Sequence, residues 1–128
     1  MAENGAEESA ARTLTRAYYD SWKEGMNRFD QERLRSILAP DLRFEGPIAG
    51  RVEGAERFIR GLTGFVRSMH GIHFLQEVYA PDQAAVLYDA ALPGGTTRFV
   101  EFFRVAGGRI AALTLFYDAH QYRELGGE

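Results

Sequence analysis

The pattern of hydrophobic and polar positions divides the chain into a helical first half and a strand-rich second half. Up to residue 69, apolar side chains recur every three or four positions, which predicts amphipathic helices. From residue 71 onward the apolar period changes to two, which predicts β-strands separated by short turns. We therefore expect helices over 10–26, 31–38 and about 54–69, and strands over 42–45, 72–80, 84–92, 98–105 and 109–118.

Local signals set the limits of these elements. Asp30 is a suitable N-cap for the second helix, and Pro40 is expected to end it. Gly61 and Gly64 weaken the third helix and would permit close packing. Residues 48–52 are expected to form a loop or a short extended piece, and 120–128 a tail. Three helices followed by an antiparallel meander predict an α+β domain, a curved sheet with helices on one face.

Domain limits follow from length and composition. The 128 residues suffice for one core, which we place at 10–128. Residues 1–9 are expected to be a disordered acidic leader, because they lack the basic and apolar regions of a signal peptide. No apolar run is long enough to span a bilayer, so we expect a cytoplasmic protein.

The strand over 98–105 contains the most informative residue, Glu101. Alternation places Phe99, Glu101 and Phe103 on one face, so a carboxyl group lies among apolar neighbours. An ionised carboxylate is costly to bury there, which predicts a paired or protonated Glu with a raised pKa. A four-residue turn over 93–96 would place Tyr88 opposite Glu101, within hydrogen-bonding reach.

The turn after this strand allows two registers. A three-residue loop over 106–108 places Leu113, Leu115 and Tyr117 on the Glu101 face. A two-residue loop instead places Phe116 and Asp118 there, because a slip of one residue flips every side chain. We prefer the first, since it groups the larger apolar side chains, and this preference weakens Asp118 as a catalytic residue.

Charge and motifs exclude several classes of function. The net charge of −3 gives no electrostatic basis for binding nucleic acid or an anionic membrane. The chain has no Cys, and its three His are too few and too dispersed for a metal site. No nucleotide-binding or nucleophile-elbow motif occurs, so we expect no cofactor. His73 begins a strand and is a minor candidate for a pocket mouth.

Three runs carry a resemblance to a known superfamily. They are APDLRFEGP over 39–47, RVEGAE over 51–56, and Phe116-Tyr117-Asp118 followed by Leu125-Gly126. In this order, over roughly residues 10–126, they resemble the SnoaL-like proteins of the nuclear-transport-factor-2-like superfamily. That resemblance implies a cone-shaped curved antiparallel sheet packed against three N-terminal helices, a cystatin-like α+β barrel with a pocket and frequent dimerisation. It does not imply one reaction.

The resemblance also suggests roles for single residues. Ketosteroid isomerases of this superfamily carry a general-base Asp where this chain has Gly46. Their oxyanion-hole Asp corresponds to Glu101, and their Tyr to Trp22, or to Tyr18 or Tyr19 in a shifted register. SnoaL-like cyclases carry an acid/base Asp near the end of the last strand, where Asp118 is the possible match. The isomerases' base is thus missing here. The epoxide hydrolases of the superfamily use an Asp-Arg-Asp set on sheet strands, and these positions correspond to apolar residues here, Ala85, Leu87 and Leu115.

We therefore expect a cofactor-independent acid/base enzyme: a cyclase, isomerase or hydrolase for a small hydrophobic molecule with a carbonyl or epoxide group. The alternatives are a non-catalytic small-molecule-binding domain and a dimerisation domain with a filled core. The candidate catalytic residues are Glu101, Tyr88 and Asp118. The candidate substrate-binding residues are Tyr18, Trp22, Phe58, Phe65, Met69, His73, Phe99, Phe103, Leu115 and Tyr117.

The opposite face of the same strand predicts a homodimer. Phe102 and Val100 lie there with Leu87 of the preceding strand, and the helices can cover only the pocket side. A contiguous apolar patch of this kind is rare on soluble monomers, so a two-fold interface would bury it, with Arg98 or Arg104 meeting Asp89 of the partner. The alternative is that the C-terminal tail covers this face.

Overall fold

The structure is a computed structural model that describes residues 9–127. The expected leader, apart from Ser9, lies outside the described residues. The helices are α2 (Ala10–Asp20), the 3-10 turn η1 (Met26–Arg28), α3 (Gln31–Ile37), α4 (Ala55–Ser68) and α5 (Ala119–Glu124). The strands are β1 (Leu38–Gly46), β2 (Gly50–Glu53), β3 (Gly71–Tyr79), β4 (Gln83–Leu92), β5 (Gly95–Ala106) and β6 (Arg109–Phe116).

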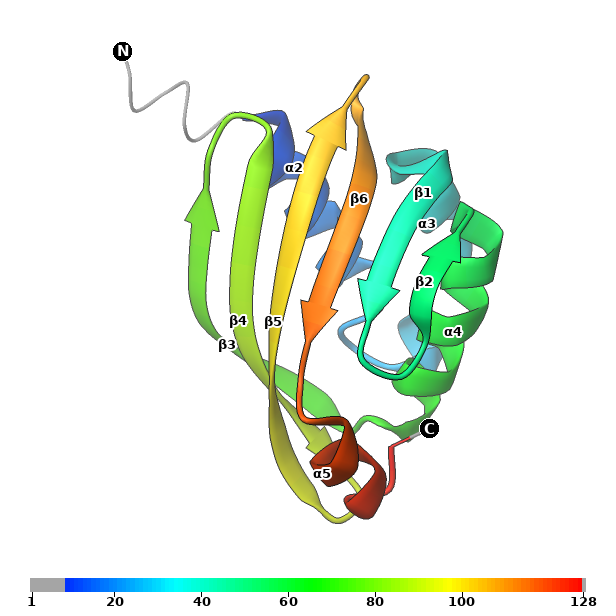
Figure 1. Cartoon of the computed structure of the whole chain (residues 1–128), viewed down its shortest axis with the longest axis vertical. Coiled ribbons are helices and arrows are strands. Elements are labelled where there is room, and N and C mark those ends of the chain that lie inside the picture. Colours follow the sequence, from blue (N-terminus) through cyan, green and yellow to red (C-terminus); the bar gives the residue numbers. More distant parts are fainter. Residues whose placement is uncertain (1–8, 128) are drawn as a thin grey trace.

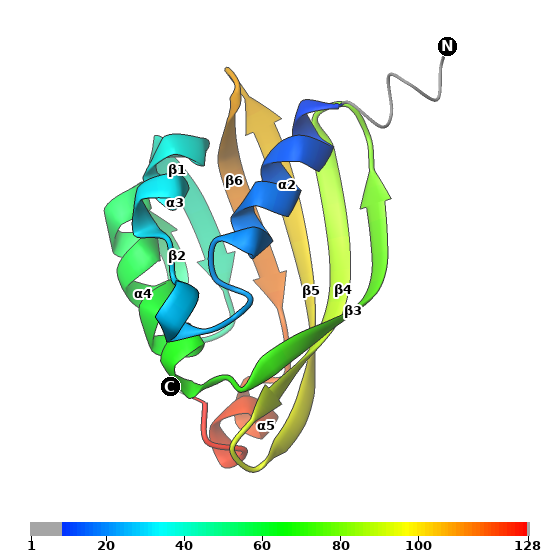
Figure 2. The same ribbon diagram turned by 180° about the vertical axis from the view of Figure 1, so that it is seen from behind.

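One curved sheet of six strands, in the order β2-β1-β6-β5-β4-β3, forms the frame of the molecule (Figure 1). Seen from behind, α2, α3 and α4 cover one face of this sheet (Figure 2). The α+β fold class is confirmed. Two details differ from the expectation: β1 pairs with β6 in parallel, so the sheet is mixed, and the sheet is open rather than closed into a barrel.

The first helix is shorter than the expected 10–26. Ser9 caps it by accepting a hydrogen bond from the Arg12 backbone N–H at 3.1 Å, and the helix ends at Asp20. The Ser21 hydroxyl bonds back to the Ala17 carbonyl at 2.7 Å, a contact that competes with helical geometry. A turn then leads to α3, where Asp30 is the N-cap, as predicted.

Pro40 does not end α3. The helix stops at Ile37, and Pro40 lies within β1. Proline lacks a backbone N–H, so it occupies a strand position that does not donate to the ladder. In the segment 48–52, expected as loop or extended, residues 48–49 form a turn and 50–52 form most of β2, which pairs antiparallel with β1 through Phe44 and Val52.

The β4–β5 hairpin has a two-residue turn instead of the expected four. Leu92 pairs with Gly95, which shifts the register by two residues and keeps every side chain on its predicted face. Glu101 consequently lies opposite Val86, and Tyr88 lies opposite Phe99. The expected Tyr88–Glu101 cross-strand pair is therefore wrong.

The β5–β6 hairpin combines both registers that the sequence left open. Its turn is the two-residue one, Gly107-Gly108, since Ala106 pairs with Arg109. A bulge then skips Ala111, so that Arg104 pairs with Ala112 and Glu101 with Leu115. The extra residue reverses the face, and Leu113 and Leu115 share the Glu101 side, as we preferred.

The C-terminal segment is not a tail. Asp118 caps α5 by accepting a hydrogen bond from the Gln121 N–H at 3.0 Å. The following turn contacts the β4–β5 hairpin, where the Gly94 N–H donates to the Leu125 carbonyl at 2.8 Å. Figure 1 shows α5 at the lower end of the sheet, so this segment does not cover the sheet's outer face.

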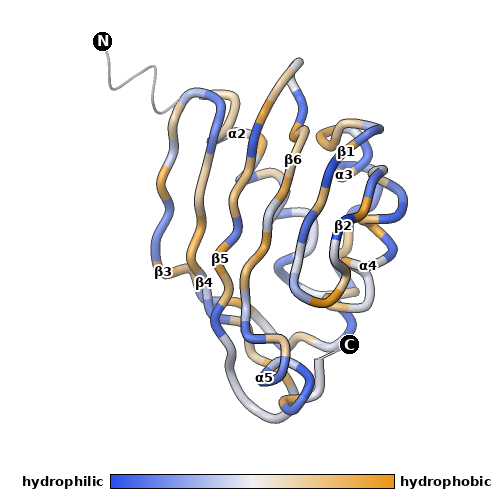
Figure 3. Tube along the Cα trace, viewed as in Figure 1, coloured by the Kyte–Doolittle hydropathy of each residue, from blue (hydrophilic) through white to orange (hydrophobic). Residues whose placement is uncertain are grey.

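The core lies between the sheet and the helices. The inward residues of β5 are almost fully buried, with Phe99 at 1%, Glu101 at 2% and Phe103 at 3% exposure. Hydropathy changes repeatedly along β4 and β5, as expected for strands with one buried face (Figure 3). No helix within residues 9–127 is long and apolar enough to cross a membrane.

Candidate active site

A cavity of about 390 Å³ opens between the sheet and α4, a size typical of small-molecule sites. Its wall is mostly apolar and aromatic. Side chains from α2, α4, β1, β4, β5 and the C-terminal segment contribute, together with bare backbone at Gly46, Gly61 and Gly64. The core is thus not filled here, which argues against the simplest dimerisation module.

Glu101 reaches this cavity from the middle of β5. Both of its carboxyl oxygens accept hydrogen bonds from neighbouring residues of α2: the Tyr19 hydroxyl donates to Oε1 at 2.6 Å, and the Tyr18 hydroxyl donates to Oε2 at 3.2 Å. Consecutive helical residues point about 100° apart. The carboxyl group lies between these two directions, and it connects the first helix to the central strand.

The environment of Glu101 favours its neutral form. Burial raises the pKa of Glu101 from 4.5 to about 7, while the hydrogen bonds from Tyr19 and Tyr18 act in the opposite direction. Burial and the nearby Glu101 charge raise the pKa of Tyr18 and of Tyr19 well above 10.0, so both hydroxyls stay protonated donors. A carboxyl group with a pKa near 7 suits proton transfer at neutral pH.

Aromatic rings pack closely around the carboxyl group. Phe103 contacts Tyr18 and Tyr19 edge-on, with centroids 5.3 and 5.8 Å away. Tyr88 stacks on Phe99 at 5.3 Å with an interplanar angle of 7°. These rings exclude water from the carboxyl group, which is the physical cause of its raised pKa.

Most of the residues predicted for the site do line the cavity. Two of the three candidate catalytic residues, Glu101 and Tyr88, line the cavity, although no hydrogen bond joins them. The substrate-binding candidates that line it are Tyr18, Trp22, Phe58, Phe65, Phe99, Leu115 and Tyr117.

Four predicted residues lie elsewhere. Asp118 is exposed and caps α5, because the β6 bulge turns its neighbour Tyr117 inward. His73 is exposed on the outer face, opposite Asp89, since strand alternation points it away from the helices. Met69 and Phe103 are buried at 6% and 3% exposure but do not line the cavity; they are core.

Sequence reasoning missed other residues of the site. Tyr19, which makes the shorter hydrogen bond to Glu101, was only an alternative register for the Tyr position. Tyr122 was placed in a tail, yet its ring packs against Phe65 and Tyr117 at the cavity wall. The sequence did contain a helical signal here: Tyr122 and Leu125 lie three residues apart, which is the spacing of neighbours on one helix face. Phe44 and Arg60 also line the cavity.

Gly46 lies close to the Phe44 ring. A Cβ built on Gly46 would lie 2.9 Å from the Phe44 ring, closer than real contacts allow. A side chain at Gly46 therefore requires the outer end of the Phe44 ring to shift. Within the cavity lining, Glu101 is the only carboxylic acid, and residues 9–127 contain no cluster of three side chains able to hold a metal ion.

Comparison with known proteins agrees with this geometry. The sequence model of the SnoaL-like domain family matches residues 15–113. The chain belongs to the SnoaL-like domain family. The resemblance found in the sequence is thereby confirmed. No curated protein sequence gives a significant match.

Several solved structures share the fold of this SnoaL-like chain. A crystal structure of a protein from Kribbella flavida DSM 17836 is 26% identical, with a TM-score of 0.80 over 91% of this chain and 93% of that one. A steroid delta-isomerase from Pseudomonas aeruginosa is 17% identical, with a TM-score of 0.76 over 93% and 88%. A de novo designed protein with a curved β-sheet is also 17% identical, with a TM-score of 0.75 over 91% of each chain.

An isomerase and a designed scaffold therefore share the SnoaL-like architecture of this chain about equally well. The fold alone does not select an activity.

Proposed function

We propose that this SnoaL-like protein is a cofactor-independent acid/base enzyme that acts on a small hydrophobic molecule with a carbonyl or epoxide group. The observation that carries the proposal is Glu101: among residues 9–127 it is the only carboxylic acid that lines the cavity, and its pKa is raised to about 7. At neutral pH both protonation states of such a group are populated, so it can accept and return a proton.

The chemistry follows from the surroundings of Glu101. The ionised form removes a proton from carbon next to a carbonyl group, and the protonated form returns it at a second position or protonates the oxygen. Tyr19 and Tyr18 stabilise the ionised form through their O–H groups. One group that performs both steps favours isomerisation or cyclisation over hydrolysis, which requires a further group to position water.

The competing function is non-catalytic binding of an apolar molecule. It is favoured by one observation: both oxygens of Glu101 already accept hydrogen bonds from the protein. A buried carboxyl group that is satisfied in this way needs no substrate. The two functions differ in whether a bound ketone exchanges protons.

Exchange of α-hydrogens for deuterium in a bound ketone, followed by NMR in D₂O, separates the two functions without knowledge of the natural substrate. With 2-acetylnaphthalene as the probe, the wild-type protein is expected to accelerate exchange, and Glu101→Gln to reduce that acceleration by about 100-fold or more. Binding of the probe without accelerated exchange would support the binding domain and overturn the enzyme.

A matched control is available for this experiment. Glu45 lies on β1 of the same sheet, separated from β5 by β6, is exposed, and does not line the cavity. Glu45→Gln removes the same charge and should leave the exchange rate unchanged. If it lowers the rate as much as Glu101→Gln does, the cavity carboxyl group is not the acid/base group.

A further inference from the structure

Two glycines interrupt α4 where the helix borders the cavity: Gly61 is exposed and Gly64 is half-buried. Gly61 and Gly64 lie in the interior of a 14-residue helix, and both line the cavity. A glycine inside a helix costs about 1 kcal/mol relative to alanine. Neither glycine has a positive φ angle, so the backbone does not require them.

Close packing does not require them either. We expected these glycines to permit a close approach of another element, and that expectation is wrong. A Cβ built on Gly61 or Gly64 meets no atom within 4 Å. The two residues leave a strip of bare helix backbone, separated by one turn, that faces open space at the cavity.

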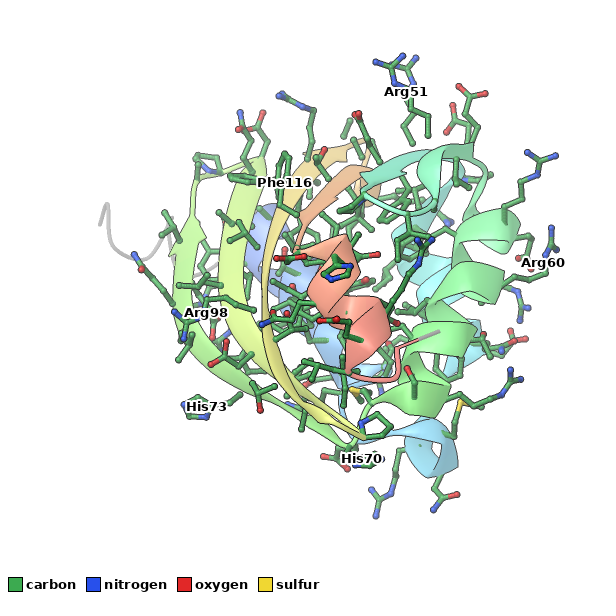
Figure 4. All side chains as sticks on the ribbon, turned by 60° about the horizontal axis from the view of Figure 1, so that its bottom comes forward. Arg51, Arg60, His70, His73, Arg98 and Phe116 are labelled. Atoms are coloured by element: carbon green, nitrogen blue, oxygen red, sulfur yellow. The ribbon has the colours of Figure 1, made fainter. Side chains whose placement is uncertain are left out.

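The strip lies on the helical wall of the cavity, whereas Glu101 lies on the sheet wall. Phe58 and Phe65 of the same helix line the cavity with their rings, so the missing side chains are confined to the two glycine positions. Gly61 is exposed and Gly64 is half-buried, so the strip lies at the open edge of the cavity. The side chain of Arg60, the residue before Gly61, projects outward from α4 (Figure 4).

We infer that Gly61 and Gly64 determine ligand size: a ligand whose polar end reaches Glu101 extends across the cavity and places its apolar end on this backbone strip. The ligand class is then an apolar molecule larger than a single ring. The inference rests on the cavity being a ligand site, as the proposed function does, but it does not need Glu101 to be catalytic.

The experiment compares two ketones that differ by one ring, acetophenone and 2-acetylnaphthalene. Trp22 is the only tryptophan of the chain and lines the cavity, so its single indole N–H resonance reports binding. The wild-type protein should bind the two-ring ketone about tenfold more tightly, from the added apolar contact. Gly64→Leu should remove this preference, while the dissociation constant of acetophenone changes less than about threefold.

Thr63→Leu is the matched control. Thr63 is the neighbour of Gly64 on the same helix and does not line the cavity. A leucine at this position should therefore leave the dissociation constants of both ketones unchanged. Gly64→Ala adds a fold check: it should raise the melting temperature, because alanine favours the helix, while it weakens binding of the larger ketone.

Three results would overturn the inference. They are equal binding, or no binding, of the two ketones by the wild-type protein; equal weakening of both by Gly64→Leu; and the same loss of preference in Thr63→Leu. The Glu101→Gln variant distinguishes failure of the ligand-size inference from failure of the proposed enzymatic function. It should abolish proton exchange and still bind the two-ring ketone more tightly.

Discussion

The Tyr19 hydroxyl donates a hydrogen bond of 2.6 Å to Oε1 of Glu101, a residue 82 positions further along the chain. The neighbouring Tyr18 bonds to the other oxygen at 3.2 Å. Through these two contacts α2 is fixed to the central strand at the base of the cavity. The same bonds set how easily the carboxyl group gives up its proton, so the first helix contributes to both stability and chemistry.

The first prediction concerns these two tyrosines. Both hydrogen bonds favour the ionised carboxylate, so Tyr19→Phe and Tyr18→Phe should each raise the pKa of Glu101 above about 7. The Tyr19 bond is shorter, and its loss should have the larger effect, about one to two pKa units. Titration of the Glu101 side-chain carbon by NMR measures both. A larger shift in Tyr18→Phe would contradict the order of the two bonds.

The second prediction concerns stability against pH. Glu101 has a pKa of about 7 when folded and about 4.5 when unfolded, so the folded state binds more protons between these values. The free energy of unfolding should therefore fall as pH rises from 4.5 to 7, by roughly 3 kcal/mol from this group. Below pH 4.5 both states are protonated and this contribution is constant.

Urea denaturation of the wild-type protein and Glu101→Gln across this pH range measures that contribution. The difference between the two proteins isolates Glu101 from surface carboxylates such as Asp89, whose pKa is lowered by its hydrogen bond with Arg98. The same pH slope in both proteins would show that Glu101 ionises normally.

The third prediction tests the space at Gly46. Gly46→Asp introduces a carboxyl group at the cavity wall, with its Cβ 2.9 Å from the Phe44 ring. The substitution should destabilise the protein by about 1 kcal/mol, the low end for overpacking, because only the outer end of the half-buried Phe44 ring must shift. In Phe44→Ala, the same substitution should cost less, because the ring is gone. Thermal denaturation of the four proteins in a double-mutant cycle measures this coupling, and additive costs would contradict the clash.

The fourth prediction concerns the outer face of the sheet, which we propose as a homodimer interface. Phe102 and Phe116 are 46% and 57% exposed, with ring centroids 6.1 Å apart, and Val78 is 54% exposed on β3. Phe116 projects from this face, as do Arg98 and His73 (Figure 4). The expected ion pair between Arg98 and Asp89 of a partner is not needed, because Arg98 donates two hydrogen bonds to Asp89 of its own chain, at 2.8 and 3.1 Å.

Sedimentation of the wild-type protein at micromolar concentration should show a dimer, and Phe102→Glu should convert it to a monomer. The control is Met26→Glu, which places the same charge on another exposed apolar residue, 42% exposed and distant from the sheet face in η1. Met26→Glu should remain dimeric. A single 14.4 kDa species for the wild-type protein would rule out the interface.

The sequence determined the local structure and the faces of the strands. The change of apolar period near residue 70 marked the end of α4 and the start of the four-strand run β3 to β6, because each period reflects a fixed backbone geometry. The sequence also identified Glu101 as a buried carboxyl group. Strand alternation places it on the same face as Phe99 and Phe103, and this does not depend on which strand pairs with β5. Nine of the predicted site residues line the cavity, some placed by strand alternation and others by the apolar face of a helix.

Only the tertiary structure decided which groups meet. The β4–β5 turn length set Val86 rather than Tyr88 opposite Glu101, and the Ala111 bulge turned Tyr117 inward and left Asp118 outside. Tyr19 became the main partner of Glu101 because α2 packs across β5, a contact between segments about 80 residues apart. Periodicity fixes a side chain's face within its own element, whereas hairpin register and helix packing depend on contacts that no local pattern contains.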